Sequence, residues 1–240
     1  MSNLPYISLI IPCFNEAERC DRLMQGLFQF LQQWQGSFEC IIVDDGSTDS
    51  SDLAIKNHPH FPLLSSHIQI LTQANQGKGA ALKTGIQQAQ GDFILTLDAD
   101  MATEPTELIQ WLKMRQTFYT KEILIGSREL KNSDVQDLGY RKIVGNIFNA
   151  IIRLFTGLPF RDTQCGFKLY PAAAAKALFD KLQTPGWSHD VEILKRANRL
   201  GYAIVEMPVH WKAIEGSKIR VVQDGFKMLF EVIRISFLKD

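Results

Sequence analysis

Short apolar runs alternate with helical patterns along the first half of the chain. The runs are rich in β-branched residues and are bounded by polar or glycine-bearing segments, which is typical of buried strands. They cover residues 6–12, 40–43, 68–71, 93–97 and 123–125. Between them, apolar residues at helical spacing predict helices over residues 23–34, 79–90 and 105–116. This repeated alternation predicts an α/β fold, in which a mostly parallel central sheet carries helices on both faces.

The second half of the chain has a less regular pattern. Residues 129–142 are polar and predict a mobile loop. Residues 143–155 and 221–238 carry apolar residues at helical spacing, and each predicts an amphipathic helix with a broad apolar face. Because we find no internal repeat and no clear linker, we expect one domain over residues 1–218. The C-terminal amphipathic helix within residues 219–240 would belong to the same unit.

Composition argues against several classes of protein. Lysine plus arginine and aspartate plus glutamate both number 26, so no overall positive field favours nucleic acid, and we expect no nucleic-acid partner. The scattered cysteines lack CxxC spacing, which favours reduced thiols over disulfides or zinc. We see no signal peptide and no run of about 18 apolar residues that would span a membrane. We therefore expect a cytoplasmic chain, either free or peripheral on the cytoplasmic face of a membrane.

Polar side chains follow four of the predicted strands at the point where each strand ends. They are Asn15-Glu16, Asp44-Asp45, Asp98 with Asp100, and Ser127-Arg128. Any single one of them could be a helix cap or a turn residue. Ligands of open α/β sheets bind at the carboxyl ends of the strands. Polar groups delivered to one edge by four strands are therefore better explained by a shared ligand such as a nucleotide.

The segment LTLDADMA, residues 95–102, is the strongest local pattern. Asp98 and Asp100 are separated by one residue at the end of an apolar strand, so both carboxylates can lie near one divalent cation. Mg²⁺ and Mn²⁺ prefer oxygen ligands and commonly bridge protein carboxylates to substrate phosphates. The alternative is that the two acids only cap the helix that begins near Pro105.

Two further segments contain groups that suit a nucleotide. In IIVDDGSTDSS, residues 41–51, Asp44 and Asp45 could accept hydrogen bonds from a base or a ribose; the alternative is an ordinary Asp-Gly turn. In NQGKGAA, residues 75–81, Gly77 and Lys78 could bring backbone N–H groups and a cation to an anion. Tight packing of a helix on the sheet at Gly79 is compatible with that interpretation.

Together these segments resemble a known family. LIIPCFNE (9–16), IIVDDGSTDSS, NQGKGAALKTGI and FILTLDADMA occur in the order and spacing of glycosyltransferase family two. Three later segments resemble its branch that makes dolichyl- and polyprenyl-phosphate sugars: IGSR (125–128), DTQCGFK (162–168) and GWSHDVEIL (186–194). The last two most resemble the dolichyl-phosphate β-glucosyltransferases, and the dolichyl-phosphate mannose synthases are related to them. The resemblance covers residues 7–218 and implies the type-A fold, a single Rossmann-like catalytic domain.

The resemblance also implies roles for individual residues. Asp98 and Asp100 would hold Mg²⁺ or Mn²⁺ and the diphosphate, while Ala102 stands where related mannosyl enzymes often carry a third ligand. The nucleotide would be bound by Pro12, Asn15, Glu16, Asp44, Asp45, Gly77, Lys78, Asp98 and Ala99. The sugar or the acceptor would be bound by Arg128, Arg141, Gln164, Gly166, Lys168, Lys212 and Lys218. The implied catalytic set is Asp98, Asp100, Arg128 and Asp190.

Some of these assignments have alternatives. Arg128 and the lysines at positions 168, 212 and 218 could be solvated surface charges, although Arg128 directly follows a strand at the ligand edge. Asp190 stands where relatives with hydroxyl acceptors keep a general base. A phosphate acceptor is already ionised at neutral pH, so Asp190 could instead orient the sugar or a neighbouring cation.

The activity implied by the resemblance is transfer of a hexose to a polyprenyl or dolichyl phosphate, with inversion. We expect glucose from UDP-glucose; GDP-mannose as the donor is the close alternative. An alternative of another class is a non-catalytic protein that binds nucleotide sugars or acts as a scaffold. The helices at 143–155 and 221–238 would lie in the membrane interface beside the prenyl chain, or pack against the sheet or a second subunit in a homodimer.

Overall fold

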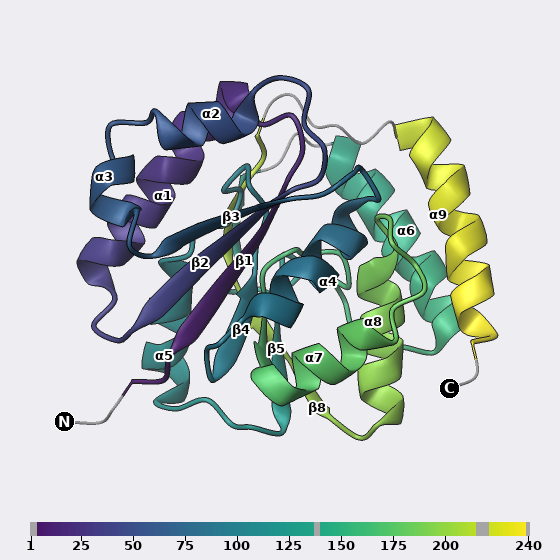
Figure 1. The fold of residues 1–240 in the computed structure, drawn as a ribbon. Coiled ribbons are helices and arrows are strands. Elements are labelled where there is room, and N and C mark those ends of the chain that lie inside the picture. Colours follow the sequence, from purple (N-terminus) through teal and green to yellow (C-terminus); the bar gives the residue numbers. More distant parts are fainter. Residues whose placement is uncertain (1–3, 137–139, 215–220, 239–240) are drawn as a thin grey trace.

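The computed structural model describes residues 4–136, 140–214 and 221–238. Its centre is a seven-stranded sheet with the strand order β3-β2-β1-β4-β7-β5-β8 (Figure 1). Neighbouring strands are parallel except that β7 runs antiparallel to both β4 and β5. The strands are β1 (Ile7–Cys13), β2 (Phe38–Asp44), β3 (Ile68–Thr72), β4 (Phe93–Thr96), β5 (Glu122–Ser127), β7 (Lys168–Pro171) and β8 (Ala203–Pro208). The predicted α/β class and the five predicted strands are confirmed.

Helices cover both faces of the sheet because successive side chains of a strand point to opposite faces. Leu9 of β1 lies in the core cluster with α1 (Cys20–Gln33) and α5 (Glu107–Arg115), beside the short elements η1 (Ala17–Arg19), α2 (Ser51–Lys56) and α3 (Phe61–Leu64). Ile10 of β1 lies in a second cluster with α4 (Lys78–Gln88), α7 (Ala172–Asp180) and α8 (His189–Arg199). The three helices predicted in the first half of the chain, at α1, α4 and α5, are confirmed.

Two amphipathic helices, α6 (Tyr140–Thr156) and α9 (Val221–Ser236), are present where the apolar periodicity predicts them. They contact each other, and α9 also contacts α8 (Figure 1). Ile152 of α6 and Val232 of α9 are fully buried in the second core cluster, so both helices pack on the body of the domain. No helix in the described residues is both long enough and apolar enough to cross a membrane.

The prediction of a polar loop over residues 129–142 is confirmed for residues 129–133, which form turns, and is wrong for residues 134–136 and 140–142. Asp134–Gln136 forms β6, which pairs in parallel with β9 (His210–Lys212) as a separate two-stranded sheet. Helix α6 then begins at Tyr140. A three-residue strand offers too few positions for a hydrophobic pattern, and its partner lies far along the chain, so local periodicity cannot reveal it.

Candidate active site at the strand ends

Asp98 and Asp100 lie in a tight turn directly after β4. The Met101 amide donates to the Asp98 carbonyl at 3.1 Å, and the Ala102 amide donates to Asp100 Oδ1 at 3.0 Å. Met101 has a positive φ of 53°, which closes the turn. Helix α5 begins further on, and its N-terminus has no side-chain cap. The alternative that the two acids only cap this helix is therefore wrong.

Lys78, at the start of α4, is the immediate counter-ion of Asp98. Its Nζ lies 2.5 Å from Asp98 Oδ1, and the Lys78 side chain is 14% exposed. Burial lowers the pKa of Lys78, but the neighbouring carboxylates, Asp98 first, outweigh burial and raise it. The ammonium therefore stays charged at neutral pH. It also lies 5.5 Å from the centroid of the Trp187 ring, which is within cation–π distance.

The carboxylate pair suits a hard divalent cation. Burial, and after it the charge of Asp98, raises the pKa of Asp100, so the two acids favour a shared positive charge. No group of three or more His, Cys, Asp or Glu side chains that could hold a metal gathers anywhere in the described residues. Mg²⁺ and Mn²⁺ accept such a site, because they bind one or two carboxylates and complete their shell with water and substrate oxygens. Asp98 and Asp100 therefore fit such an ion, and Ala102 has no side-chain oxygen to add.

Gly166 lies against the Asp98 carboxylate. A Cβ atom at this position would be 2.5 Å from Asp98 Oδ2, closer than any side chain tolerates. The Gly166 carbonyl accepts a hydrogen bond of 2.9 Å from Thr96 Oγ1 at the end of β4. The segment after Asp162 is therefore joined to the strand that delivers the carboxylate pair, and only glycine fits at the point of contact.

Asp45, at the end of β2, holds the loop that carries Lys78. Its carboxylate accepts hydrogen bonds from the Gln76 amide at 2.9 Å, the Gly77 amide at 2.7 Å and Gln73 Nε2 at 2.7 Å. The side chain is buried. Asp45 lies where a nucleoside-binding residue is expected, but its contacts are with this loop, so it fixes the position of Lys78.

The loops after β1 and β2 interlock at the same edge of the sheet. Asn15 has a positive φ of 54°, and its Oδ1 accepts a hydrogen bond of 2.7 Å from the Thr48 amide. Asp44 Oδ1 accepts one of 2.9 Å from the Ser47 amide. Glu16 forms an ion pair of 2.6 Å with Arg19. The structure therefore brings Asn15, Glu16 and Asp44 together, next to Pro12 at the end of β1.

Lys168 and Asp190 form an enclosed ion pair. Lys168 Nζ lies 2.6 Å from Asp190 Oδ1 and also donates to the Cys165 carbonyl at 2.5 Å. Lys168 has no exposed surface, so the interpretation of this residue as a solvated surface charge is wrong. Burial raises the pKa of Asp190, but the charges of His189, Lys168 and Lys78 outweigh burial and lower it. Asp190 is thus an ionised carboxylate that is already committed to a cation.

Arg128, directly after β5, is held by Asp162. Its Nε lies 2.7 Å from Asp162 Oδ2 and its Nη2 lies 3.0 Å from Oδ1, which is a bidentate pair. Asp162 is 1% exposed, and its charge raises the pKa of Arg128 despite burial. The guanidinium also lies 5.4 Å from the centroid of the Trp211 ring. The interpretation of Arg128 as a solvated surface charge is therefore wrong as well.

The remaining predicted residues occupy different positions. Gln164 Nε2 is buried and has no hydrogen-bond partner in the described part of the chain, so it can donate to a ligand. Lys212 is exposed on β9, and its amide donates to the Ala102 carbonyl at 2.9 Å, beside the carboxylate turn. Ala99 is buried within that turn. The side chain of Arg141 and the whole of Lys218 lie outside the described residues.

Four contributors at this site are not among the residues predicted from the sequence. Asp162 and Cys165 fall inside the segment DTQCGFK, which marks the region but not their partners. Trp187 and His189 precede Asp190 inside GWSHDVEIL, which likewise marks the region but not their contacts. The partners of Asp162 and Trp187, which are Arg128 and Lys78, are distant in sequence, so only the spacing of the segments could have indicated these contacts. Cys165 and His189 instead act on near neighbours, Lys168 and Asp190.

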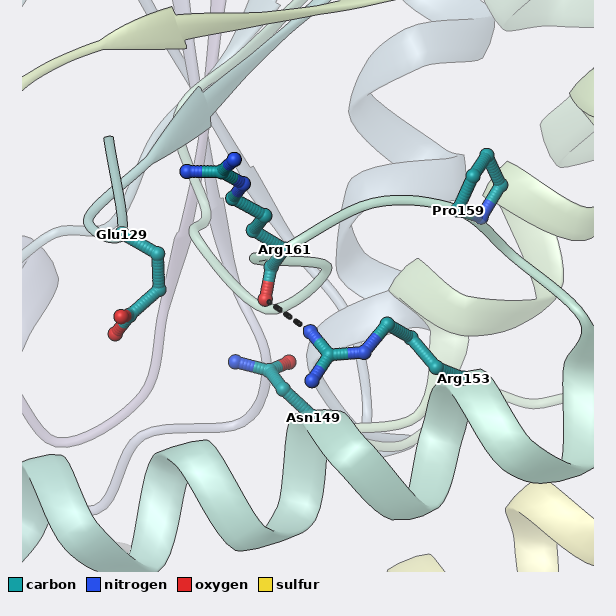
Figure 2. Close-up of a pocket in the computed structure, with 5 residues that line it drawn as sticks. All are labelled: Glu129, Asn149, Arg153, Pro159 and Arg161. Atoms are coloured by element: carbon teal, nitrogen blue, oxygen red, sulfur yellow. Dashed lines mark hydrogen bonds between the residues drawn. The ribbon is translucent and has the colours of Figure 1, made fainter. Parts of the chain in front are cut away.

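A cavity of about 590 Å³ lies between α6 and the segment before Asp162 (Figure 2). Arg153 Nη1 donates to the Arg161 carbonyl at 3.4 Å across it. Figure 2 shows Asn149 beside Arg153 on α6 and Glu129 on the opposite wall. Neither Asp98 nor Asp100 lines this cavity, so it does not outline the strand-end site.

Comparison with known proteins gives matches over most of the chain. The family model described as Glycosyl transferase family 2 matches residues 8–179. A dolichyl-phosphate beta-glucosyltransferase of Dictyostelium discoideum is 33% identical over 97% of this chain and 74% of its own length. The Homo sapiens protein of the same name is 33% identical over 97% of this chain and 76% of its own length.

A solved structure with the same fold comes from a more distant protein. It is glucosyl-3-phosphoglycerate synthase from Mycobacterium tuberculosis, crystallised with Mn²⁺, UDP and glucosyl-3-phosphoglycerate. It superposes with a TM-score of 0.68 at 17% sequence identity, covering 98% of this chain and 81% of that chain. At this identity the likeness establishes the arrangement of the sheet and its helices, and nothing finer.

Proposed function

The chain belongs to glycosyltransferase family 2, and we propose that it transfers glucose from UDP-glucose to a polyprenyl phosphate, with inversion at the anomeric carbon. The observation that carries the proposal is the charge arrangement at the strand ends. There, the Asp98–Asp100 pair has Lys78 as its counter-ion, and Asp190 is already committed to Lys168. The dolichyl-phosphate beta-glucosyltransferase names of the relatives support the same sugar and acceptor class.

Asp98 and Asp100 would hold Mg²⁺ or Mn²⁺ against the donor diphosphate. When bound there, the ion neutralises charge that develops on the leaving group. The oxygen ligands of the carboxylate turn support this assignment, as does the Mn²⁺ bound together with UDP in the glucosyl-3-phosphoglycerate synthase structure. Lys78, at 2.5 Å from Asp98, supplies a second positive charge for the diphosphate.

A lipid phosphate acceptor is compatible with a site in which Asp190, the expected general base, is paired with Lys168. One acceptor oxygen forms a bond to the anomeric carbon while the bond from that carbon to the diphosphate oxygen breaks. The electron pair leaves with the diphosphate, and no proton has to be removed from the acceptor. Asp190 is ionised but enclosed with Lys168, so its role is to fix that lysine and the backbone around Cys165.

Gln164 and Arg128 are the groups that we assign to the sugar and acceptor side. The Nε2 of Gln164, which has no hydrogen-bond partner among the described residues, supports a hydrogen bond to a ligand oxygen. The Arg128 side chain is 27% exposed, so its guanidinium can still meet an anion while Asp162 keeps it in place. Because the pair with Asp162 partly neutralises Arg128, its main contribution would be orientation of the acceptor phosphate.

We assign membrane contact to the outer surface of α6 and α9, which would bring the prenyl chain to the protein. Leu154 of α6 is 80% exposed, Phe230 of α9 is 72% exposed, and Phe237, directly after α9, is 77% exposed. Exposed apolar side chains on helices whose other face is packed are typical of elements that lie in a membrane interface. A second copy of the chain on the same surface is the alternative.

A screen of donors and acceptors tests the proposed function. The chain would be incubated with UDP-glucose or GDP-mannose, a short-chain polyprenyl phosphate, and Mn²⁺ or Mg²⁺. We expect glucosyl transfer from UDP-glucose that stops when the metal is chelated. Transfer from GDP-mannose and not from UDP-glucose would show that the donor is GDP-mannose. Transfer to a hydroxyl acceptor with none to a lipid phosphate would overturn the acceptor, and nucleotide binding without any transfer would favour a non-catalytic role.

A further inference from the structure

We infer that Lys78 is a placeholder cation: it neutralises Asp98 before the donor binds and turns to the diphosphate when a divalent ion takes that carboxylate. The inference rests on the proposed function, because it needs a metal at Asp98 and Asp100. It goes further by making the binding of metal and the binding of nucleotide depend on each other through one side chain.

The ammonium of Lys78 occupies the position that a metal ion would need. Its Nζ is 2.5 Å from Asp98 Oδ1. Because no group of three or more potential metal-binding His, Cys, Asp or Glu side chains gathers in the described residues, we expect only Asp100 to share the ion with Asp98. Asp100 Oδ1 is in turn engaged by the Ala102 amide at 3.0 Å. A metal without a diphosphate therefore has few protein oxygens to gain and must displace a bound positive charge to reach Asp98.

The backbone around Lys78 is fixed on both sides, so only its side chain is free to turn. Asp45 accepts hydrogen bonds from the Gln76 and Gly77 amides. On the other side, the Ala80 amide donates to the Pro185 carbonyl at 3.1 Å, and a Cβ at position 77 would be 2.8 Å from that carbonyl oxygen. Gly77, with a φ of 101°, is the residue that allows this close approach.

The ammonium has a second partner close to its present position. The Trp187 ring centroid lies 5.5 Å from Lys78 Nζ, and Trp187 is an exposed residue. A lysine that leaves Asp98 can therefore stay over the ring while it reaches for a phosphate oxygen. The move exchanges one charge partner for another and does not send the cation into bulk water.

The binding consequences follow from electrostatics. Without a diphosphate, Lys78 opposes the metal, because two positive charges then compete for Asp98. With a diphosphate, Lys78 gains a new anionic partner and releases the carboxylate. The nucleotide therefore strengthens metal binding, and by linkage the metal strengthens nucleotide binding by the same factor.

The test measures Mn²⁺ binding by electron paramagnetic resonance of the free ion, with and without UDP. In the unaltered chain we expect UDP to strengthen Mn²⁺ binding by about tenfold or more. In Lys78→Met, we expect Mn²⁺ without UDP to bind about tenfold more tightly than in the unaltered chain, because the competing charge is gone. The strengthening by UDP should become smaller in this variant. Lys78→Gln gives the same readout if Lys78→Met does not fold.

Two further variants separate charge from general disturbance. Lys78→Arg keeps the positive charge and should retain the weak binding of Mn²⁺ without UDP. Lys83→Met removes a cation from the same helix that is bonded to the Asp180 carbonyl, and it should leave both affinities unchanged. Unchanged or weaker Mn²⁺ binding in the uncharged variants at position 78, or equal behaviour of Lys78→Arg and Lys78→Met, would overturn the placeholder role. If the unaltered chain binds no Mn²⁺ even with UDP, the metal assignment of the proposed function fails as well.

Discussion

Lys168 Nζ lies 2.6 Å from Asp190 Oδ1, and both side chains are enclosed by protein. Such a pair is costly to separate, because either charge left alone would be buried without a partner. Lys168 also holds the Cys165 carbonyl, one residue before the glycine that touches Asp98. The ion pair therefore supports the carboxylate turn through the intervening backbone. In this pair Lys168 also engages Asp190, the carboxylate that a hydroxyl acceptor would need as a general base.

The first prediction concerns Asp190→Asn. Asparagine keeps an oxygen for Lys168, and transfer to a phosphate needs no base, so we expect kcat/KM for polyprenyl phosphate to stay within about tenfold of the unaltered chain. Removal of a true general base typically costs about a hundredfold to ten-thousandfold and removes the acidic limb of the pH profile. The measurement is kcat/KM as a function of pH for both chains. A loss of that size together with a missing acidic limb would restore Asp190 as the base.

The first half of the fold could be predicted from the sequence because each of its strands is a short run made mostly of apolar residues. Strand β7 could not, since it begins with Lys168, which is buried only because Asp190 lies opposite. Helix α8 could not be predicted from the sequence for a similar reason. Its Glu192 is fully buried, which is possible because Arg196 and two backbone amides bind it. Buried charges of this kind break the apolar pattern from which elements are recognised.

The site was predictable as a region and unpredictable as a set of contacts. Polar residues after parallel strands must meet at one edge of the sheet, so the proximity of Asp45 and Asp98 follows from topology. The partner of each residue does not follow from topology. Arg128 meets Asp162, and Asp45 meets the loop before Lys78, only because three-dimensional packing brings distant segments together.

The second prediction concerns the stability of the Arg128–Asp162 pair. Burial raises the pKa of Asp162, but the charge of Arg128 and its hydrogen bonds outweigh burial and lower it. A carboxyl whose pKa is lowered on folding stabilises the fold above its unfolded pKa, about 3.9, and this stability is lost as the pH falls through the folded pKa. Asp162→Asn should lower the free energy of unfolding at pH 7 by about 3–5 kcal/mol.

Urea denaturation at several pH values measures this effect. The difference between Asp162→Asn and the unaltered chain should be constant at neutral pH and should shrink only below about pH 4. Asp52→Asn is the matched control, because it removes a partly exposed carboxylate whose Oδ2 lies 3.3 Å from Lys56 Nζ. It should change the free energy of unfolding by less than about 0.5 kcal/mol. A difference for Asp162→Asn that is independent of pH down to the acid transition would contradict the assignment.

The third prediction concerns the contact of Gly166 with Asp98. In Gly166→Ala the new methyl group would lie 2.5 Å from Asp98 Oδ2, so the carboxylate or the backbone has to move. A displacement of about 1 Å at reacting groups costs about a hundredfold in rate. We therefore expect kcat to fall by about a hundredfold and Mn²⁺ binding in the presence of UDP to weaken.

Gly145→Ala provides the control for this substitution. Gly145 lies in α6, and a Cβ there would meet no described atom within 4 Å. Alanine is the better helix former, so this variant should be as stable as the unaltered chain or more stable by up to about 1 kcal/mol, with unchanged kcat. Full activity of Gly166→Ala, at the same metal affinity, would show that the carboxylate turn does not depend on this contact.

The last prediction concerns the outer surface of α9. Deletion of the helix would also remove Val232 and Ile235, which are fully buried, so a truncated chain would lose core packing together with any membrane contact. Phe230→Ser with Phe237→Ser removes only exposed rings. Full burial of one such ring contributes about 1.5–3 kcal/mol, so partial burial of both rings in a membrane interface should make the double variant lose about tenfold in its partitioning to liposomes. Flotation of both chains with liposomes measures this, and Leu200→Ser, which alters a residue 55% exposed at the end of α8, is the control. If the double variant floats as well as the unaltered chain, the membrane role of α9 is wrong. A change from dimer to monomer in the same variant would instead identify a second subunit as the partner of this surface.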